Sequence, residues 1–294
     1  MKFADLSYQI AINEKFDVIH AHDWMTMIAG INIKKNTGKP LVVHIHSLEV
    51  DRGGENSKGW VYEMEKNTME QADIIIPVSH FTASNIVKYY GINKDKMYVV
   101  HNGSKPEKKY KNKRIYKEQT VLFVGRLTRQ KGPEIFVEIA QKVLSKNKNI
   151  RFVMAGEGDY YTSVIDKYSS LNLGDRFHMT GFLHKKELNN LFSIADVYCM
   201  TSVSEPFGLS AVEAAQFNVP CIISKQSGVA EVLKSSLKFD CWDTDKAANQ
   251  ILSLLKYPTL GNKLTADASN DLSNISWEKS ANEVLNAYQT FNLI

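Results

Sequence analysis

Residues 121–133 read VLFVGRLTRQKGP, and a run with helical periodicity follows as far as residue 146. Four apolar residues in succession end at Gly125, a pattern typical of a strand buried on both faces of a parallel sheet. The same alternation of a short apolar run with a longer helical stretch recurs along the chain. It predicts an α/β fold in which parallel strands and helices alternate.

The predicted strands are short and rich in Val and Ile, and helical stretches separate them. Strands are expected at 17–22, 41–47, 73–79, 97–101, 121–125, 150–156, 177–183, 197–201, 220–224 and 237–242. Helices are expected at 61–72, 82–90, 133–146, 185–195 and 208–217. A last helix is expected at about 277–290, and it could pack back on the N-terminal domain.

One basic segment interrupts this rhythm. Residues 104–119, SKPEKKYKNKRIYKEQ, carry seven Lys or Arg and almost no aliphatic pattern. An anion-binding tail is one interpretation, and a solvated linker between two domains is the favoured one. We therefore expect a partial N-terminal domain at 1–104, a linker at 105–119 and a complete nucleotide-binding domain at 120–294.

Composition limits the classes of protein. The 294 residues are 44% hydrophobic and 23% charged with a net charge of +4, which excludes a disordered chain and makes nucleic acid an unnecessary partner. The three cysteines have no metal-site or redox spacing, and no apolar run approaches the ~20 residues of a membrane span. We expect a cytoplasmic protein with reduced, buried thiols and no transmembrane segment.

The stretch 201–214, TSVSEPFGLSAVEA, carries two glutamates around a predicted helix start. The free N–H groups near Gly208 suit a phosphate or sugar oxygens, and Glu213 could accept hydrogen bonds from a ribose diol. Alternatively, Glu205 caps the helix and Glu213 lies on a solvated face. For the two glutamates alone, this second interpretation is the favoured one.

Two cations follow the strand that ends at Gly125. Arg126 and Lys131 are expected at the carboxyl end of the sheet, where open α/β sheets bind ligands. A guanidinium and an ammonium group would neutralise the charge of a pyrophosphate leaving group. Two unrelated surface cations are the alternative.

Histidines mark two neighbouring strand ends, in HAHDW at 20–24 and HIH at 44–46. Alternate residues share a face of a strand, so a zinc site is a rival interpretation. The H-x-H-x-D-H pattern of metal hydrolases fails, because Asp23 follows His22 directly and Trp24 comes next. We therefore expect no metal, and the two histidine pairs suggest the wall of a cleft.

Two further motifs are interpreted as structural. Asp243-Thr244-Asp245 resembles a metal-binding Asp-x-Asp, but a helix N-cap is favoured because a helical run follows. Gly156-Glu157-Gly158 falls short of a dinucleotide fingerprint because residue 161 is Tyr.

In combination these stretches resemble a glycosyltransferase of the GT-B fold, family 4, and within it the glycogen-synthase-like members. The matching segments cover nearly the whole chain: DVIHAHDW (17–24), HIHSLEVDR (44–52), ADIIIPVS (72–79), VVHNG (99–103), LFVGRLTRQKGP (122–133), FVMAGEGD (152–159), TGFL (180–183), SVSEPFGLSAVEA (202–214), SKQSGVAEVL (224–233) and SWEKSANEVLNAY (276–288).

The resemblance implies two Rossmann-like parallel-sheet domains and a retaining hexosyl transfer, with glucose as the favoured sugar, from a nucleotide-diphosphate sugar to an acceptor such as a glucan. No cofactor or metal is implied, since the leaving phosphate helps to deprotonate the acceptor. The implied catalytic residues are His22, Arg126, Lys131 and Glu205, and the implied donor-binding residues are Gly125, Phe182, Leu183, Gly208, Leu209 and Glu213.

The resemblance also implies that the N-terminal domain is incomplete. Family members carry several β-α units before the strand that matches DVIHAHDW, and here 16 residues precede it. Two expectations follow from this. Another chain could supply the missing half, or the protein could be a truncated, non-catalytic module that binds a nucleotide sugar.

Overall fold

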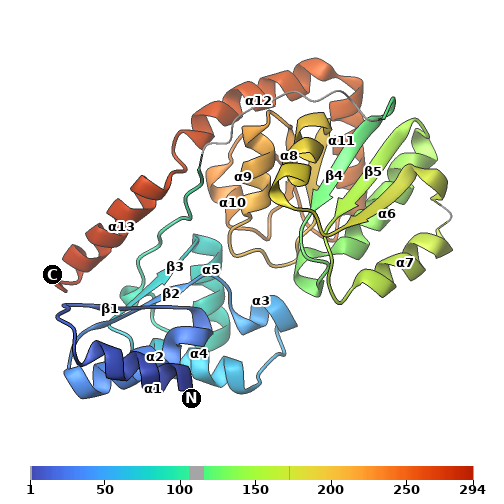
Figure 1. Ribbon diagram of the computed structural model, residues 1–294. Coiled ribbons are helices and arrows are strands. Elements are labelled where there is room, and N and C mark those ends of the chain that lie inside the picture. Colours follow the sequence, from blue (N-terminus) through green and yellow to red (C-terminus); the bar gives the residue numbers. More distant parts are fainter. Residues whose placement is uncertain (1, 106–115, 172, 294) are drawn as a thin grey trace. The chain divides into compact units, whose positions relative to one another are not determined.

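A computed structural model describes residues 2–105, 116–171 and 173–293, which form two compact units (Figure 1). The first unit comprises Met1–Gly103 and Trp277–Ile294, and the second comprises Ser104–Ser276. Most of the predicted basic linker, at 106–115, lies outside the described residues. The last helix of the chain thus belongs to the first unit.

The second unit contains a six-stranded parallel sheet in the order β6-β5-β4-β7-β8-β9. Counted within the unit, this order is 3-2-1-4-5-6, the order of a Rossmann fold. The order reverses between β4 and β7, which are neighbours in the sheet although two strands separate them in sequence. The strands are β4 (Gln119–Val124), β5 (Ile150–Ala155), β6 (Phe177–Gly181), β7 (Val197–Met200), β8 (Cys221–Ser224) and β9 (Leu237–Phe239).

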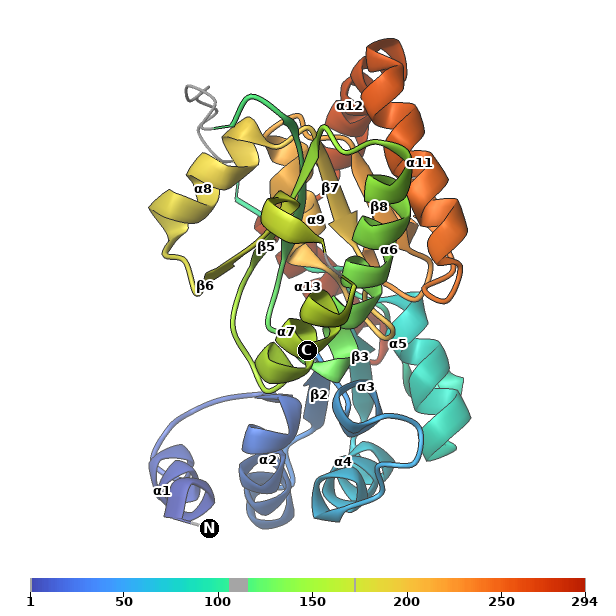
Figure 2. The same cartoon turned by 90° about the vertical axis from the view of Figure 1, so that its right-hand side faces the viewer.

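Helices cover both faces of this sheet. Phe123 of β4 packs in one core with α6 and α11, whereas Tyr198 of β7 contacts Phe192 of α8 on the other face. Figure 2 shows α8 and α6 on opposite sides of the strands. The helices are α6 (Pro133–Lys146), α7 (Tyr161–Ser170), α8 (Lys185–Ile194), α9 (Leu209–Gln216), α10 (Val229–Val232), α11 (Thr244–Lys256) and α12 (Pro258–Leu272).

The first unit is built on a three-stranded parallel sheet in the order β1-β2-β3. Val43 of β2 packs in a core with α2 and α4, and Val42 packs with Ala287 of α13 on the other face. The elements are α1 (Lys2–Ala11), β1 (Ile19–His22), α2 (Asp23–Thr37), β2 (Leu41–Ile45), α3 (Glu49–Gly53), α4 (Trp60–Gln71), β3 (Ile74–Pro77), α5 (His80–Asn85), a π-helix (Ile86–Tyr90) and α13 (Trp277–Thr290).

Two expectations for the first unit need correction, and one helix was not expected. The predicted strand at 97–101 forms only a single bridge to Ile75, although Tyr98 and Val100 donate backbone hydrogen bonds to β3. The predicted helix at 82–90 is α5 followed by the π-helix. Helix α1 was not predicted, although its sequence has a helical period; its Phe3, Leu6 and Ile10 are exposed, whereas Ala4 is buried. Local periodicity alone could not reveal the first two features.

The expectations for the thiols and for the Asp243 N-cap agree with the structure. Cys199, Cys221 and Cys241 are buried and unpaired. Asp243 caps α11, accepting a hydrogen bond from the backbone N–H of Lys246 at 3.0 Å. Across the described parts of the chain, no helix is both long and apolar enough to cross a membrane.

Candidate active site

The predicted donor site lies where the strand order of the second unit reverses. Gly125 follows β4 and Thr201 follows β7, and these two parallel strands are hydrogen-bonded neighbours. Their carboxyl ends therefore meet at one edge of the sheet, the place where open α/β folds form a ligand-binding crevice. The predicted motif at 121–133 crosses this edge as β4 ends, and the motif at 201–214 begins there.

Gly156 allows the β5 loop to approach the β4 loop closely. Its φ of +143° is one that residues with a side chain rarely adopt, and an added Cβ would lie 1.9 Å from the carbonyl oxygen of Gly125. Leu127 then donates a backbone hydrogen bond to Glu157 at 2.8 Å. The segment Gly156-Glu157-Gly158 thus shapes the loop that carries Arg126. This agrees with the prediction that the segment is structural rather than a dinucleotide-binding motif.

Hydrogen bonds fasten the β7 loop to the β4 loop. The buried Thr201 hydroxyl donates to the carbonyl oxygen of Gly132 at 2.8 Å, and Val203 donates its backbone N–H to Gln130 at 2.9 Å. Lys131 lies between these anchor points, in a single 3₁₀ turn. The main chain on both sides of the predicted site is therefore held in one arrangement.

Lys131 and Glu205 form an ion pair at the centre of this region. Lys131 Nζ lies 2.5 Å from Glu205 Oε2, and the same oxygen accepts a hydrogen bond from the Ser202 hydroxyl at 3.0 Å. The Glu205 side chain is 7% exposed and that of Lys131 is 22% exposed. The capping interpretation of Glu205 is wrong, because its carboxylate binds Lys131 and Ser202, and helix α9 has Gly208 as its N-cap.

The N-terminus of α9 opens towards the same edge of the sheet. Gly208 has φ +114°, and an added Cβ would lie 2.9 Å from Val229 Cγ1, so only glycine fits without strain. Leu209 follows as the first helical residue and is 40% exposed. The hydroxyl of the buried Tyr198 hydrogen-bonds Ser210 at 2.7 Å and so ties the helix to β7. The exposed N–H groups here suit an anion.

Glu213 lies one turn further along α9 and has a cationic partner. Its Oε1 lies 2.8 Å from Lys185 Nζ, at the start of α8. The Glu213 side chain is 27% exposed, so it is half-buried rather than on a fully solvated face. Its carboxylate keeps a second oxygen with which to accept hydrogen bonds from a ligand.

Phe182 and Leu183 follow the end of β6, which is shorter than predicted. The strand ends at Gly181, so both residues lie in the loop before α8. Phe182 is 63% exposed and meets His184 edge to face, with ring centroids 5.3 Å apart. The exposed ring of Phe182 can pack against a planar base. The backbone of the neighbouring Leu183 can form hydrogen bonds with the edge of that base.

Four histidines gather in the first unit, at the carboxyl ends of β1 and β2. Strand register pairs His22 with His44. His20 Nε2 lies 3.2 Å from His44 Nδ1, and His22 Nδ1 lies 3.0 Å from His46 Nε2. Tyr288 of α13 hydrogen-bonds the remaining nitrogen, Nδ1, of His20. His22 stacks on the rings of the other three histidines and is the exposed member of the cluster.

Burial keeps this cluster neutral. It lowers the pKa of His20 to about 4 and that of His44 to about 2, and repulsion from neighbouring imidazoles adds to the effect. The pKa of His22 is also lowered, first by burial and then by His46, while Asp23 opposes the shift. A neutral His22 has a lone pair available at one ring nitrogen.

Asp23 orients the end of β1. It has φ +55°, which is unusual for a residue other than glycine. In this conformation its Oδ1 accepts hydrogen bonds from the backbone N–H groups of His46 and Ser47, at 2.7 and 3.3 Å. The strained residue therefore joins the two histidine-bearing strand ends, as strain at a functional site often does.

Comparison with known proteins identifies the family. The profile for glycosyl transferases group 1 matches residues 104–271, and that for glycosyltransferase family 4 matches residues 2–108. The glycosyltransferase MJ1607 of Methanocaldococcus jannaschii is 31% identical over 94% of this chain and 76% of its own length. The chain belongs to the family 4 glycosyltransferases.

Solved structures show that this glycosyltransferase has the GT-B fold of two Rossmann-like domains. Sucrose-phosphate synthase of Thermosynechococcus elongatus matches 99% of the chain and 77% of its own with a TM-score of 0.83 and 21% identity. Anabaena HepE, solved in complex with UDP and glucose, matches 99% and 81% with a TM-score of 0.82 and 17% identity. The comparisons give no support to a truncation or to a partner chain that supplies a missing half.

The structure pairs Lys131 with Glu205. It places the other predicted residues of the second unit in α9 or in loops that follow strands of the same sheet, and His22 in the first unit. Two residues of the glycosyltransferase were missed. Ser202 binds Glu205, and its position directly after a strand within SVSEPFG was the available signal. Lys185 pairs with Glu213 from 28 residues away, a contact that no local pattern indicates.

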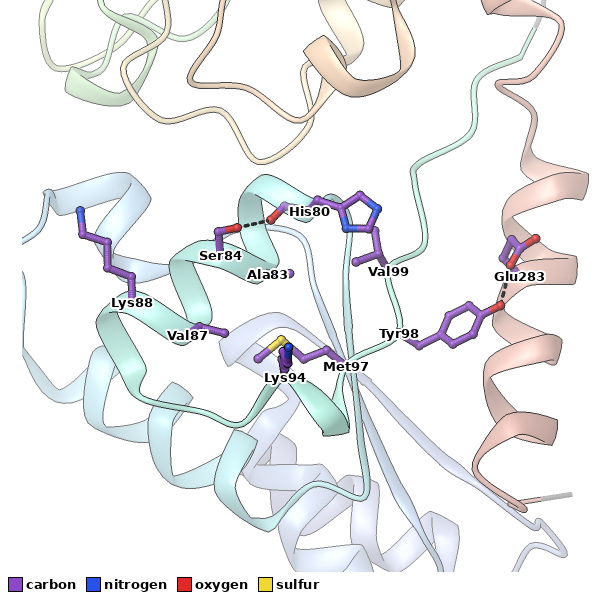
Figure 3. A pocket seen from close by; sticks show the side chains of 10 residues that line it. All are labelled: His80, Ala83, Ser84, Val87, Lys88, Lys94, Met97, Tyr98, Val99 and Glu283. Atoms are coloured by element: carbon purple, nitrogen blue, oxygen red, sulfur yellow. Dashed lines mark hydrogen bonds between the residues drawn. The ribbon is translucent and has the colours of Figure 1, made fainter.

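The glycosyltransferase also has a cavity of about 650 Å³ within its first unit (Figure 3). Its walls are α5, the π-helix, the segment 97–99 and Glu283 of α13, which accepts a hydrogen bond from Tyr98 at 2.8 Å. Apolar groups such as Val87 and Met97 predominate over Lys88 and Lys94. None of the residues predicted for donor binding or catalysis lines it.

Proposed function

We propose that this glycosyltransferase transfers a hexosyl group, with glucose the favoured sugar, from a nucleotide-diphosphate donor to an acceptor such as a glucan. The observation that carries the proposal is that the Lys131–Glu205 ion pair and the N-terminus of α9 both lie where the strand order reverses. Arg126 adds an exposed guanidinium, to which no ion pair is found among the described residues. Anabaena HepE has been solved in complex with UDP and glucose and in complex with UDP-glucose.

In the proposed mechanism Arg126 and Lys131 bind the donor diphosphate, and their charge stabilises it as the leaving group. The bond between the anomeric carbon and the phosphate oxygen breaks, and the acceptor oxygen bonds to that carbon on the same face. The acceptor proton passes to the leaving phosphate. The configuration is retained, and the step needs no metal or cofactor.

The remaining residues bind the donor. Glu205 contacts the sugar, and the backbone N–H groups of Gly208 and Leu209 donate to its hydroxyls or to the phosphate. Glu213 accepts hydrogen bonds from the ribose, and the main chain of Leu183 meets the base beside Phe182 and Gly125. From the first unit, His22 contacts the donor sugar as a neutral imidazole. Such a reaction belongs to carbohydrate biosynthesis, and cytoplasmic localisation stays a prediction.

The experiment has two arms on the purified chain. Calorimetry with UDP-glucose and ADP-glucose should detect binding that Lys131→Ala and Glu213→Ala abolish and that the surface control Asp267→Asn leaves intact. Transfer to a glucan oligosaccharide, followed by NMR of the anomeric proton, should show the donor configuration in the product. Failure of any common nucleotide sugar to bind would refute the proposal. Binding without turnover would instead favour the non-catalytic module.

A further inference from the structure

The histidine cluster contains a buried ring nitrogen without a partner. His44 is 7% exposed, and its Nε2 is buried and makes no hydrogen bond, while its Nδ1 contacts His20. A neutral imidazole has one donor and one acceptor nitrogen, so either tautomer leaves Nε2 unsatisfied. Such an orphan group costs free energy and calls for an explanation, and an ion is one of the usual ones.

Three ring nitrogens lie close enough to share an ion. One nitrogen each from His20, His22 and His44 lie within 4.8 Å of one another. Zinc–nitrogen bonds of about 2.0–2.1 Å in a tetrahedron separate the ligand atoms by about 3.4 Å. Ligand atoms that lie as far as 4.8 Å apart therefore need to approach by about 1.4 Å. Because His22 is exposed, a fourth position could take water.

The surroundings complete the requirements of a metal site. Imidazole is a preferred ligand of zinc, nickel and copper, and these three rings are neutral. Tyr288 hydrogen-bonds the Nδ1 of His20 and orients that ring, as outer partners of metal-bound histidines do. Asp23 supplies a nearby negative charge through its electrostatic interaction with His22.

We propose that His20, His22 and His44 bind one divalent transition-metal ion, with zinc the best fit, and that the bound ion inhibits sugar transfer. The inhibition rests on the proposed function, in which His22 contacts the donor sugar. A metal-bound His22 cannot make that contact, so the ion would act as an inhibitor of a reaction that needs no metal. The binding itself does not depend on the proposed function.

The first test is binding of the metal alone to the full chain after chelator treatment. Titration with Co²⁺ should produce a d–d absorption band of a low-coordinate site at one ion per chain, and Zn²⁺ should abolish it. The variant His44→Asn preserves shape and polarity but should weaken zinc binding by roughly 100-fold or more. His44→Cys should retain metal binding and add a thiolate-to-Co²⁺ charge-transfer band. This result would show that the loss of binding in His44→Asn comes from the lost ligand and not from misfolding.

Control variants separate this site from adventitious binding. His184→Ala removes an exposed histidine of the second unit and should leave zinc binding unchanged. His46→Ala removes the hydrogen-bond partner of His22 and should weaken binding by about 10-fold. Absence of a stoichiometric site, or zinc binding that His44→Asn leaves unchanged, would overturn the proposal.

The second test measures transfer at increasing zinc concentration. Zinc should inhibit the wild-type chain over the range in which it binds, and His44→Asn should keep basal transfer and lose the inhibition. Stoichiometric binding with no effect on transfer would refute the inhibitory half alone. Binding in a chain that shows no transfer under any condition would count against the proposed function and leave the metal site standing.

Discussion

The two sheet edges that carry the predicted residues use opposite electrostatics. In the second unit, the Lys131–Glu205 ion pair keeps full charges in a largely buried loop. In the first unit, burial holds His20 and His44 neutral. The difference suits the two proposals. The edge proposed to bind a charged diphosphate holds charges that are paired with each other, whereas the edge proposed to bind a sugar or a metal ion offers uncharged lone pairs.

The largest expected effect is on the charged edge. Lys131→Ala should lower transfer by roughly 100- to 1000-fold, because it removes charge stabilisation of the leaving group. It also leaves Glu205 buried without a counter-charge. This should cost about 2 kcal/mol of unfolding free energy, less than the ~3–5 kcal/mol of a fully buried pair, since Lys131 is partly exposed. Steady-state transfer and urea unfolding measure the two effects.

Lys142→Ala is the matched control for that variant. Lys142 forms an exposed ion pair with Asp245 in the same unit, so its loss should change stability by less than about 1 kcal/mol and leave transfer intact. If Lys131→Ala transferred sugar as fast as the wild type, the charged edge of the second unit would have no role in the reaction.

The loop that positions the charged edge should tolerate no side chain at residue 156. Gly156→Ala places a methyl group against the carbonyl oxygen of Gly125 at φ +143° and should cost about 3 kcal/mol of unfolding free energy. Gly261→Ala in α12 is the control, because its nearest contact is 3.6 Å and helical alanine should add about 0.5–1 kcal/mol. Equal stabilities in thermal unfolding would show that the β5 loop can move aside.

The neutral edge should make stability depend on pH. The pKa values of His20 and His44 in the folded protein lie below the ordinary value of 6.5. At a pH between the folded value and 6.5, the unfolded chain therefore binds more protons than the folded chain does. The stability they contribute is complete above pH 6.5 and is lost as pH falls towards the folded values. The loss approaches about 1.4 kcal/mol per pH unit for each histidine.

Urea unfolding of the chelator-treated protein between pH 7 and 5 measures this slope. His44→Leu removes one titrating group, so its slope should be shallower than that of the wild type. An unchanged slope would mean that His44 titrates normally in the folded state and would break the contrast between the two edges.

The smallest effect on stability is expected at Glu213. The variant Glu213→Gln loses an ion pair with Lys185, which is 51% exposed, so unfolding should change by less than about 1 kcal/mol. Nucleotide-sugar affinity should nevertheless fall about 10-fold, because a charged hydrogen-bond acceptor for the ribose is lost. Calorimetry measures the affinity, and Asp267→Asn is the control on an exposed pair. Unaltered affinity would return Glu213 to a structural role.

Local chemistry explains why much of the fold could be predicted. The helix at 133–146 has Pro133 at its start and apolar residues at helical spacing, and the structure has α6 at the same bounds. The failure at 97–101 has a different origin. A run such as MYVV favours a strand, yet whether it pairs depends on the edge of β3 and on α13, which are distant in sequence.

The sequence by itself determined the alternation of strands and helices, the family and the identity of the candidate residues, because periodicity and motif spacing are local. Only the tertiary structure decided which groups meet. Lys131 and Glu205 are 74 residues apart in the chain, and Tyr288 reaches His20 across 268 residues. Strand order and register fix these encounters. Burial then sets the charge of each group, so the ion pair and the neutral histidines could not be predicted from residue type alone.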